Sequence, residues 1–155
     1  MYPTKYIITS GKGISQYQLV AFDNALLDAG ISNYNLLKVS SILPANCAKV
    51  ESINDLPQGS PLLTAFASIS SNKIGEQIAS AVAAGIPEDR SNIGVIMEYS
   101  AANITSELAE KRVKEMVREA MKNHNISLDH IESSSVDGIV PSEGFLSIIS
   151  AISFW

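Results

Sequence analysis

Few residues of this chain could take part in covalent or acid–base chemistry. The two histidines, His124 and His130, have no cysteine or acidic partner at a spacing typical of a metal site, which indicates two solvent-exposed side chains and no metal. No G-x-S-x-G motif marks a hydrolase nucleophile. Cys47 has no positive neighbour closer than Lys49, which predicts an unreactive thiol. These residues therefore predict neither a hydrolytic nor a metal-dependent site.

The remaining candidate for nucleophilic chemistry is the pair Ser40-Ser41. The chain has four Ser-Ser pairs, about the number that chance predicts in so serine-rich a sequence, so a pair alone carries no information. This pair follows an apolar segment with the composition of a strand, residues 34–39, and precedes two apolar residues and Pro44. Proline at that position prevents a helix and favours a fixed turn. Its context therefore distinguishes Ser40-Ser41 from the other pairs.

The sequence around this pair resembles the self-cleavage region of the pyruvoyl-dependent arginine decarboxylases. Other parts of the chain are similar to the same family in order and spacing: the loop after the cleavage segment, the helix that follows, a glutamate-bearing strand and a late strand. The region around the serine pair comprises residues 21–44, and the four further segments are, in order, residues 56–59, 75–87, 94–99 and 131–133. Each is weak by itself, but their collinearity over nearly the whole chain makes the resemblance specific.

The resemblance implies a self-processing enzyme. Decarboxylation of an amino acid leaves a carbanion at Cα, which needs an electron sink that side chains do not provide. By analogy with the family, the Ser41 hydroxyl attacks the carbonyl of Ser40 and converts the peptide bond to an ester. Elimination then releases residues 1–40 as a β chain, and the dehydroalanine left at the start of the α chain, 41–155, hydrolyses to a pyruvoyl group. A Schiff base between this covalent cofactor and L-arginine leads to agmatine and CO2, without a metal or pyridoxal phosphate.

The resemblance also assigns roles to Asn35 and Glu98. Asn35, six residues before Ser41, aligns with the family asparagine near the cleavage site, whose amide can polarise the scissile carbonyl. Glu98 aligns with the glutamate that donates a proton to the carbanion, and its place near the end of an apolar strand predicts a raised pKa. Lys38 is expected to be a solvent-exposed lysine at the edge of a strand.

Asp23 aligns with the family aspartate that receives the guanidinium group of the substrate. It lies four residues from both Leu19 and Leu27, so on a helix its carboxylate would share a face with apolar side chains. A planar guanidinium can pair with such a carboxylate through two parallel hydrogen bonds. Asp28, near the end of the same segment, is expected to be an ordinary surface residue.

The elements expected to position these residues alternate between strands and helices. Periodicity and turn signals predict strands at 6–10, 34–39, 62–70, 93–99, 128–137 and 145–154, and helices at 16–29, 74–84 and 105–122. Ser15 and Thr105 are the expected N-caps of the first and last helices, Gly30 the C-terminal glycine of the first, and residues 11–13 a turn. We expect a single α/β domain over residues 1–155, and the resemblance implies a four-layer αββα sandwich of two mainly antiparallel sheets flanked by helices.

Composition favours association between copies of the chain. Of 155 residues, 46% are hydrophobic and 17% charged, so much apolar surface must be buried in a small protein. The net charge of −5, without a basic cluster, argues against nucleic acid as a partner. No apolar run reaches the roughly 20 residues of a membrane helix, and the N-terminus lacks a signal peptide, so we expect a cytoplasmic protein with no membrane partner. The resemblance implies a homo-oligomer, a trimer or a dimer of trimers.

Two alternatives stay open. The substrate could be another cationic amino acid or amine, because an aspartate recognises positive charge without measuring chain length. The chain could also be an unprocessed, non-catalytic paralogue. A denaturing gel distinguishes the second alternative from the enzyme, because a processed enzyme gives two bands and an unprocessed chain gives one.

Overall fold

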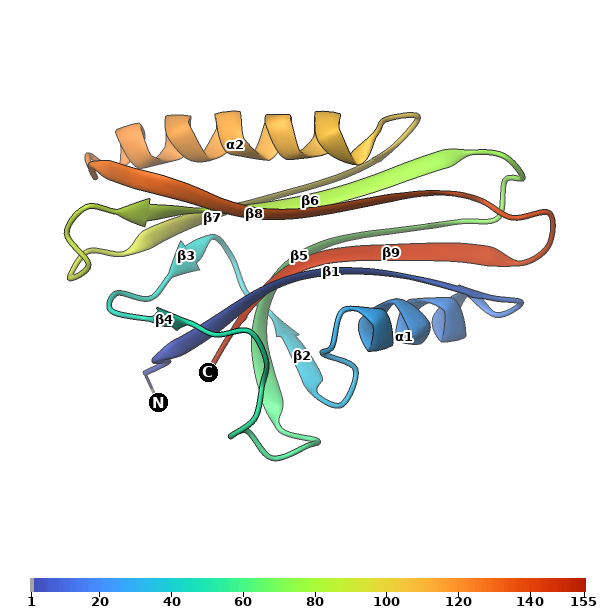
Figure 1. The fold of residues 1–155 in the computed structure, drawn as a ribbon, viewed down its shortest axis with the longest axis horizontal. Coiled ribbons are helices and arrows are strands. Elements are labelled where there is room, and N and C mark those ends of the chain that lie inside the picture. Colours follow the sequence, from blue (N-terminus) through green and yellow to red (C-terminus); the bar gives the residue numbers. More distant parts are fainter. Residues whose placement is uncertain (1) are drawn as a thin grey trace.

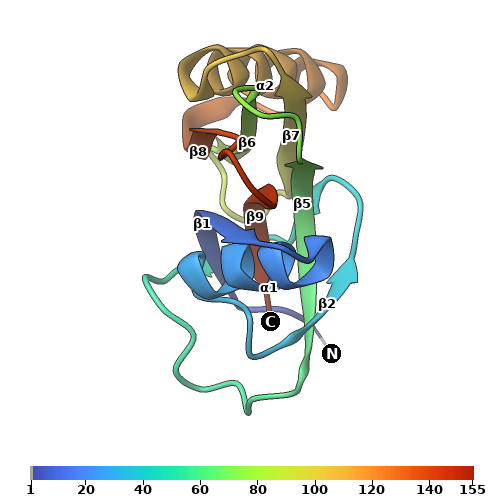
Figure 2. The same cartoon turned by 90° about the vertical axis from the view of Figure 1, so that its right-hand side faces the viewer.

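A computed structural model describes residues 2–155 as a four-layer αββα sandwich, which confirms the expected fold class. Helix α1 covers the outer face of a five-stranded sheet, and helix α2 covers the outer face of a four-stranded sheet that packs against the first (Figure 1). The view from the side separates the four layers (Figure 2). In chain order the elements are β1 (Lys5–Ser15), α1 (Gln18–Asp28), β2 (Asn35–Lys38), β3 (Ile42–Leu43), β4 (Ala48–Lys49), β5 (Pro61–Ser71), β6 (Gln77–Pro87), β7 (Gly94–Ala102), α2 (Ser106–Asn123), β8 (Leu128–Ile139) and β9 (Phe145–Phe154).

The two sheets differ in how their edges are built. The five-stranded sheet has the order β2-β5-β9-β1-β4, with an antiparallel centre and one parallel strand at each edge. The four-stranded sheet has the order β3-β7-β6-β8 and is antiparallel throughout. The chain therefore passes from the edge of one sheet, β2, to the edge of the other, β3. The two-residue strands β3 and β4 were not foreseen from the sequence.

The prediction of a helix at residues 74–84 is wrong, because this segment is mostly strand β6. β6 lies in the four-stranded sheet between β7 and β8, and nearly all of it is buried on both faces. Ala79, Ala81 and Ala83 face α2, while Val82 and Ile86 face the other sheet. A strand covered on both sides loses the alternation of apolar and polar residues, and its alanines suggest a helix.

The turn predicted at residues 11–13 is also wrong, because β1 continues through both glycines. A side chain at Gly11 or Gly13 would collide with the backbone of α1: an added Cβ would lie 2.3 Å from the Ala25 oxygen and 2.6 Å from the Ala21 oxygen, respectively. The glycines therefore let α1 lie directly on β1. Lys12, between them, points to the other sheet, where its ammonium donates to the Asp137 carbonyl at 3.2 Å.

Helix α1 begins later than predicted and ends as predicted. Its N-cap is Tyr17, whose side chain makes no capping hydrogen bond, so the prediction of Ser15 as the cap is wrong. At the C-terminus Gly30 has a φ of 76°, and the N–H groups of Gly30 and Ile31 donate to the carbonyls of Leu27 and Leu26. This pair of hydrogen bonds is a Schellman motif, which requires the left-handed conformation that glycine adopts readily.

Helix α2 follows its predicted pattern closely. The Thr105 hydroxyl caps the helix by accepting a hydrogen bond from the Leu108 N–H at 3.2 Å. One face of α2 is buried against the four-stranded sheet. Glu110 forms an ion pair of 2.9 Å with Lys114 and also accepts hydrogen bonds from Ser133 and Ser135 of β8. A capped helix with one apolar face is the pattern most easily recognised in a sequence.

Candidate active site

The Ser40-Ser41 peptide lies where the chain crosses from one sheet to the other. On one side of it, the Val39 N–H donates to the Thr64 carbonyl of β5 at 3.1 Å. On the other side, the Ile96 N–H of β7 donates to the Ser41 carbonyl at 2.7 Å. Residues 39 and 41 are thus tied to different sheets, and the peptide bond between the two serines spans the gap. The strands after and before it, β3 and β2, are both sheet edges.

The chain after Ser41 is held as firmly as the chain before it. Leu43 is buried between the sheets, and its neighbour Pro44 leads into a turn. In this turn Asn46 adopts a φ of 59°, and its N–H donates to the Arg90 carbonyl at 2.9 Å. Ser41 itself is partly buried and Ser40 is exposed. The serine pair therefore sits in a constrained segment that solvent can still reach.

Glu98 lies beside this crossing. It is two residues beyond Ile96 on β7, and side chains two apart on a strand share a face. The Lys38 ammonium lies 3.6 Å from a Glu98 carboxylate oxygen. Burial raises the pKa of Glu98 above its ordinary value, and the positive charge of Lys38 partly opposes this rise. A carboxyl with a raised pKa is suited to donate a proton near neutral pH.

Asn35 lies at the opposite end of β2 from Ser40. Its side-chain amide donates to the Gly59 carbonyl at 2.7 Å, and its backbone N–H donates to the Ser60 carbonyl at 3.0 Å. At about 3.3 Å per residue, the strand alone separates Asn35 from Lys38 by roughly 10 Å. Within one chain the Asn35 amide is thus placed against residues 59–60 and not against the serine pair.

Asp23 is also not brought together with Ser41 inside one chain. It lies on α1, which packs on β1 and β9, whereas Ser41 lies next to β3 and β7 on the other side of the view (Figure 1). Asp23 is exposed, and the leucines on either side of it are exposed too, Leu19 by 78% and Leu27 by 57%. An exposed carboxylate flanked by exposed apolar side chains is typical of a surface that meets another molecule.

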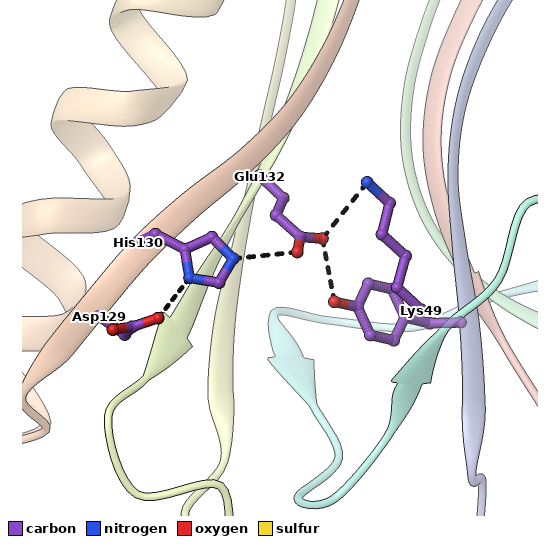
Figure 3. A network of polar contacts seen from close by, with 5 residues as sticks. Lys49, Asp129, His130 and Glu132 are labelled. Carbon is purple, nitrogen blue, oxygen red and sulfur yellow. Dashed lines mark hydrogen bonds and ion pairs between the residues drawn. The ribbon is translucent and has the colours of Figure 1, made fainter.

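A second polar cluster joins the two sheets (Figure 3). His130 on β8 contacts Asp129 at 2.6 Å and Glu132 at 3.0 Å. Glu132 also accepts a hydrogen bond from the Tyr6 hydroxyl at 2.9 Å and lies 3.7 Å from the Lys49 ammonium. Hydrogen bonds to Glu132 and Asp129 raise the pKa of His130. His130 is thus exposed, as the sequence predicted, and is also paired with two carboxylates.

Other sequence expectations concern residues outside these clusters. Asp28, expected to be an ordinary surface residue, accepts a hydrogen bond from the Lys12 N–H at 2.9 Å. The Cys47 thiol donates to the Pro3 carbonyl at 3.2 Å, and burial raises its pKa, which disfavours the reactive thiolate. Within residues 2–155, no three histidine, cysteine or acidic side chains are grouped so that they could hold a metal ion. In the same range, no helix has the length and apolar character needed to cross a membrane.

The environment of Lys38 could not be foreseen from the sequence. Besides its contact with Glu98, the Lys38 ammonium lies 4.5 Å from the centre of the Phe66 ring on β5. Lys38 and Phe66 are close because β2 pairs with β5 in parallel, and Glu98 joins them because the two sheets pack. The only sequence feature that could have pointed to a role for Lys38 is its position two residues before Ser40.

The residues around Ser41 fit a pyruvoyl group formed from that serine. Such a group keeps the backbone carbonyl of residue 41 and replaces only the amino group and hydroxymethyl side chain. The hydrogen bond from the Ile96 N–H to this carbonyl does not involve the groups that change. The anchoring seen here therefore suits both the serine and the group that would replace it.

Comparison with known proteins identifies the family. Residues 5–155 match the family model described as pyruvoyl-dependent arginine decarboxylase. The chain is 38% identical over 153 residues to the pyruvoyl-dependent arginine decarboxylase of Methanococcus aeolicus, which covers 99% of this chain and 90% of that protein. It is 39% identical over 142 residues to the protein of the same name from Methanocaldococcus jannaschii (92% and 85% covered), and 34% identical over 152 residues to that from Thermococcus kodakarensis (98% and 96% covered). The chain therefore belongs to the pyruvoyl-dependent arginine decarboxylase family, as the serine pair and its collinear segments predicted.

Proposed function

We propose that this protein cleaves itself between Ser40 and Ser41 and then converts L-arginine to agmatine and CO2. The observation that carries the proposal is the attachment of residues 39 and 41 to different sheets, with the serine pair between them, in a chain of this family. The enzyme acts on a small cationic substrate and needs no partner other than copies of itself. We place the reaction in the cytoplasm, where the lone free thiol of Cys47 stays reduced.

Self-cleavage begins with attack of the Ser41 hydroxyl on the Ser40 carbonyl. The hydroxyl oxygen forms the ester bond, the C–N bond breaks, and the hydroxyl proton ends on the freed amine. Loss of a proton from Cα of residue 41 then eliminates Ser40 as a carboxylate and leaves dehydroalanine. Its hydrolysis releases ammonia and gives the pyruvoyl group. The hydrogen bonds of Val39 and Ser41 support these steps by holding the backbone on either side of the bond that breaks.

In the decarboxylation the pyruvoyl group supplies a ketone that captures the substrate amine and an adjacent amide carbonyl that withdraws electrons. The Ile96 N–H, which points at the carbonyl oxygen of residue 41 at 2.7 Å, stabilises negative charge there. After CO2 leaves, Glu98 donates a proton to the substrate Cα. Its raised pKa keeps this carboxyl protonated at a higher pH than an exposed glutamate would be.

The site is completed by a second copy of the chain. Within one protomer Asp23 lies on α1, which contacts β1 and β9 and not the strands beside Ser41. The exposed Leu19 and Leu27 on either side of Asp23 favour burial of this surface against a neighbouring protomer. In a trimer, or a dimer of trimers, Asp23 of one protomer holds the arginine guanidinium at the Ser41 of the next. Asn35 lies at the far end of β2 from Ser40, so its amide would polarise the Ser40 carbonyl of a neighbouring protomer across the same interface.

A denaturing gel of the purified protein tests the processing step. The proposal predicts two bands, from residues 1–40 and 41–155, and a single full-length band for Ser41→Ala. A single band for the unchanged protein would refute self-cleavage and favour the unprocessed paralogue. Two bands with Ser41→Ala would refute the assignment of the nucleophile.

Release of CO2 from arginine, lysine and ornithine, measured side by side, tests the substrate. Arginine is expected to react fastest, and Asp23→Asn to raise the KM for arginine while leaving the gel pattern unchanged. No CO2 from arginine, with CO2 from another cationic amino acid, would show that the substrate assignment is wrong.

A further inference from the structure

Lys38 is held more firmly than an edge lysine usually is. Its ammonium lies 4.5 Å from the centre of the Phe66 ring and 3.6 Å from the Glu98 carboxylate, although its side chain is 58% exposed. The ring attracts the cation through its negative face, and the apolar stem of lysine packs against such a surface. Phe66 therefore fixes the direction of the Lys38 side chain, and that direction leads to Glu98.

Among residues 2–155, Lys38 is the only charged side chain that forms an ion pair with Glu98. Within residues 2–155, the neighbouring strands β3, β5, β6 and β9 contain no acidic, basic, histidine, cysteine or tyrosine residue. On β7 itself, Tyr99 points to the opposite face, where Arg112 of α2 donates to its hydroxyl at 2.8 Å. The charge that Glu98 experiences in the intact chain thus comes from one side chain.

We propose that Lys38 is a positioning residue of the decarboxylation, which holds the Glu98 carboxyl beside residue 41 and sets the pH range over which that carboxyl carries the proton it donates. This inference rests on the proposed function of Glu98 as proton donor. Lys38 does not touch the substrate; it acts through Glu98.

The sign of the effect follows from the charges. Burial favours the neutral carboxylic acid of Glu98, whereas the Lys38 ammonium favours the carboxylate. Removing the ammonium therefore extends the protonated form of Glu98 to higher pH. Cleavage creates a further charge, the carboxylate of Ser40, two residues from Lys38, so the effect is best measured in both the cleaved and the uncleaved protein.

In the cleaved enzyme the test is the pH dependence of kcat. Lys38→Met keeps an apolar stem over Phe66 and removes the charge. We expect the alkaline limb of its profile to move up by about one pH unit, the effect of losing an opposite charge at this distance. Lys38→Arg should keep the profile of the unchanged enzyme. Lys49→Met is the matched control, because Lys49 lies 3.7 Å from Glu132 in a comparable pair that does not include Glu98, and its profile should not move.

If Lys38 only holds β2 against β5, Lys38→Met lowers kcat equally at every pH and the limb stays in place, which would overturn the proposal. In the uncleaved Ser41→Ala background, carboxyl 13C NMR titration of Glu98 with and without Lys38→Met gives a second readout that needs no processing or activity. An unchanged titration midpoint there would also overturn it. Failure of the proposed function is a separate result, because the protein with Lys38 intact would then release no CO2 from arginine.

Discussion

Replacing Gly11 by alanine tests whether α1 depends on direct contact with β1. The added Cβ would lie 2.3 Å from the Ala25 oxygen and 2.6 Å from the Ala29 nitrogen, whereas ordinary contacts of a Cβ begin at 3.4 Å. Both atoms belong to the helix backbone, so no side chain can rotate away. To relieve the contact, α1 must move locally by about 1 Å away from the sheet on which its buried face packs.

The expected cost follows from two opposing effects. Overpacking against rigid atoms destabilises a protein by about 1–3 kcal/mol, and the upper part of this range applies because two backbone atoms are in the way. Alanine in place of glycine in a strand returns about 0.5–1 kcal/mol of conformational entropy. The net loss for Gly11→Ala is therefore about 2 kcal/mol, which lowers the melting temperature of a chain of this size by about 4–8 °C.

Urea denaturation in the Ser41→Ala background, at one protein concentration, measures this loss on an uncleaved chain. Gly138→Ala on β8 is the matched control, because its Cβ would meet side chains and no backbone, the Leu146 Cδ2 at 2.9 Å and the Lys12 Cδ at 3.6 Å. We expect that variant to stay within about 1 kcal/mol of its parent. Equal stabilities of Gly11→Ala and Gly138→Ala would refute the close packing of α1. Because α1 carries Asp23, the cleaved Gly11→Ala enzyme should also show a raised KM for arginine.

Three further predictions concern the site, the second polar cluster and the fragments. Glu98→Gln should still be cleaved but lose about 10²- to 10⁴-fold in kcat, the usual contribution of a general acid; turnover within tenfold of the unchanged enzyme would contradict this role. Hydrogen bonds to Glu132 and Asp129 raise the pKa of His130 above the ordinary 6.5, so its ion pairs stabilise the fold fully below that value and are lost as the pH rises through the raised pKa. His130→Gln should therefore lower the free energy of unfolding by less than about 1 kcal/mol in mild acid and not at all well above the raised pKa, whereas an equal loss at both would show that charge is not the cause. After cleavage, residues 1–40 should co-elute with 41–155 on size exclusion, because β1 stays paired along β9; separate elution would contradict this.

Helix α2 was predicted from its cap at Thr105 and its single apolar stripe. Strand β9 matches its predicted bounds of residues 145–154 although both of its faces are buried, because isoleucine and phenylalanine favour strands. Strand β6 is buried in the same way but is rich in alanine, which favours a helix, and so it was not recognised. The continuation of β1 through Gly11 and Gly13 was hidden for a different reason, because glycines there make room for a helix that is distant in sequence until the chain folds.

The sequence alone determined the family and the candidate residues, because the motif around Ser41 and the segments collinear with it are local patterns that need no folded structure to be read. Only the tertiary structure decided which of those residues meet. Pairing of β3 with β7 places the strand that carries Glu98 beside Ser41, and packing of the two sheets brings the Lys38 ammonium within 3.6 Å of Glu98. The same packing leaves Asp23 on α1, which contacts β1 and β9 and not the strands beside Ser41. Such distances depend on contacts between residues far apart in the chain, which sequence spacing does not encode.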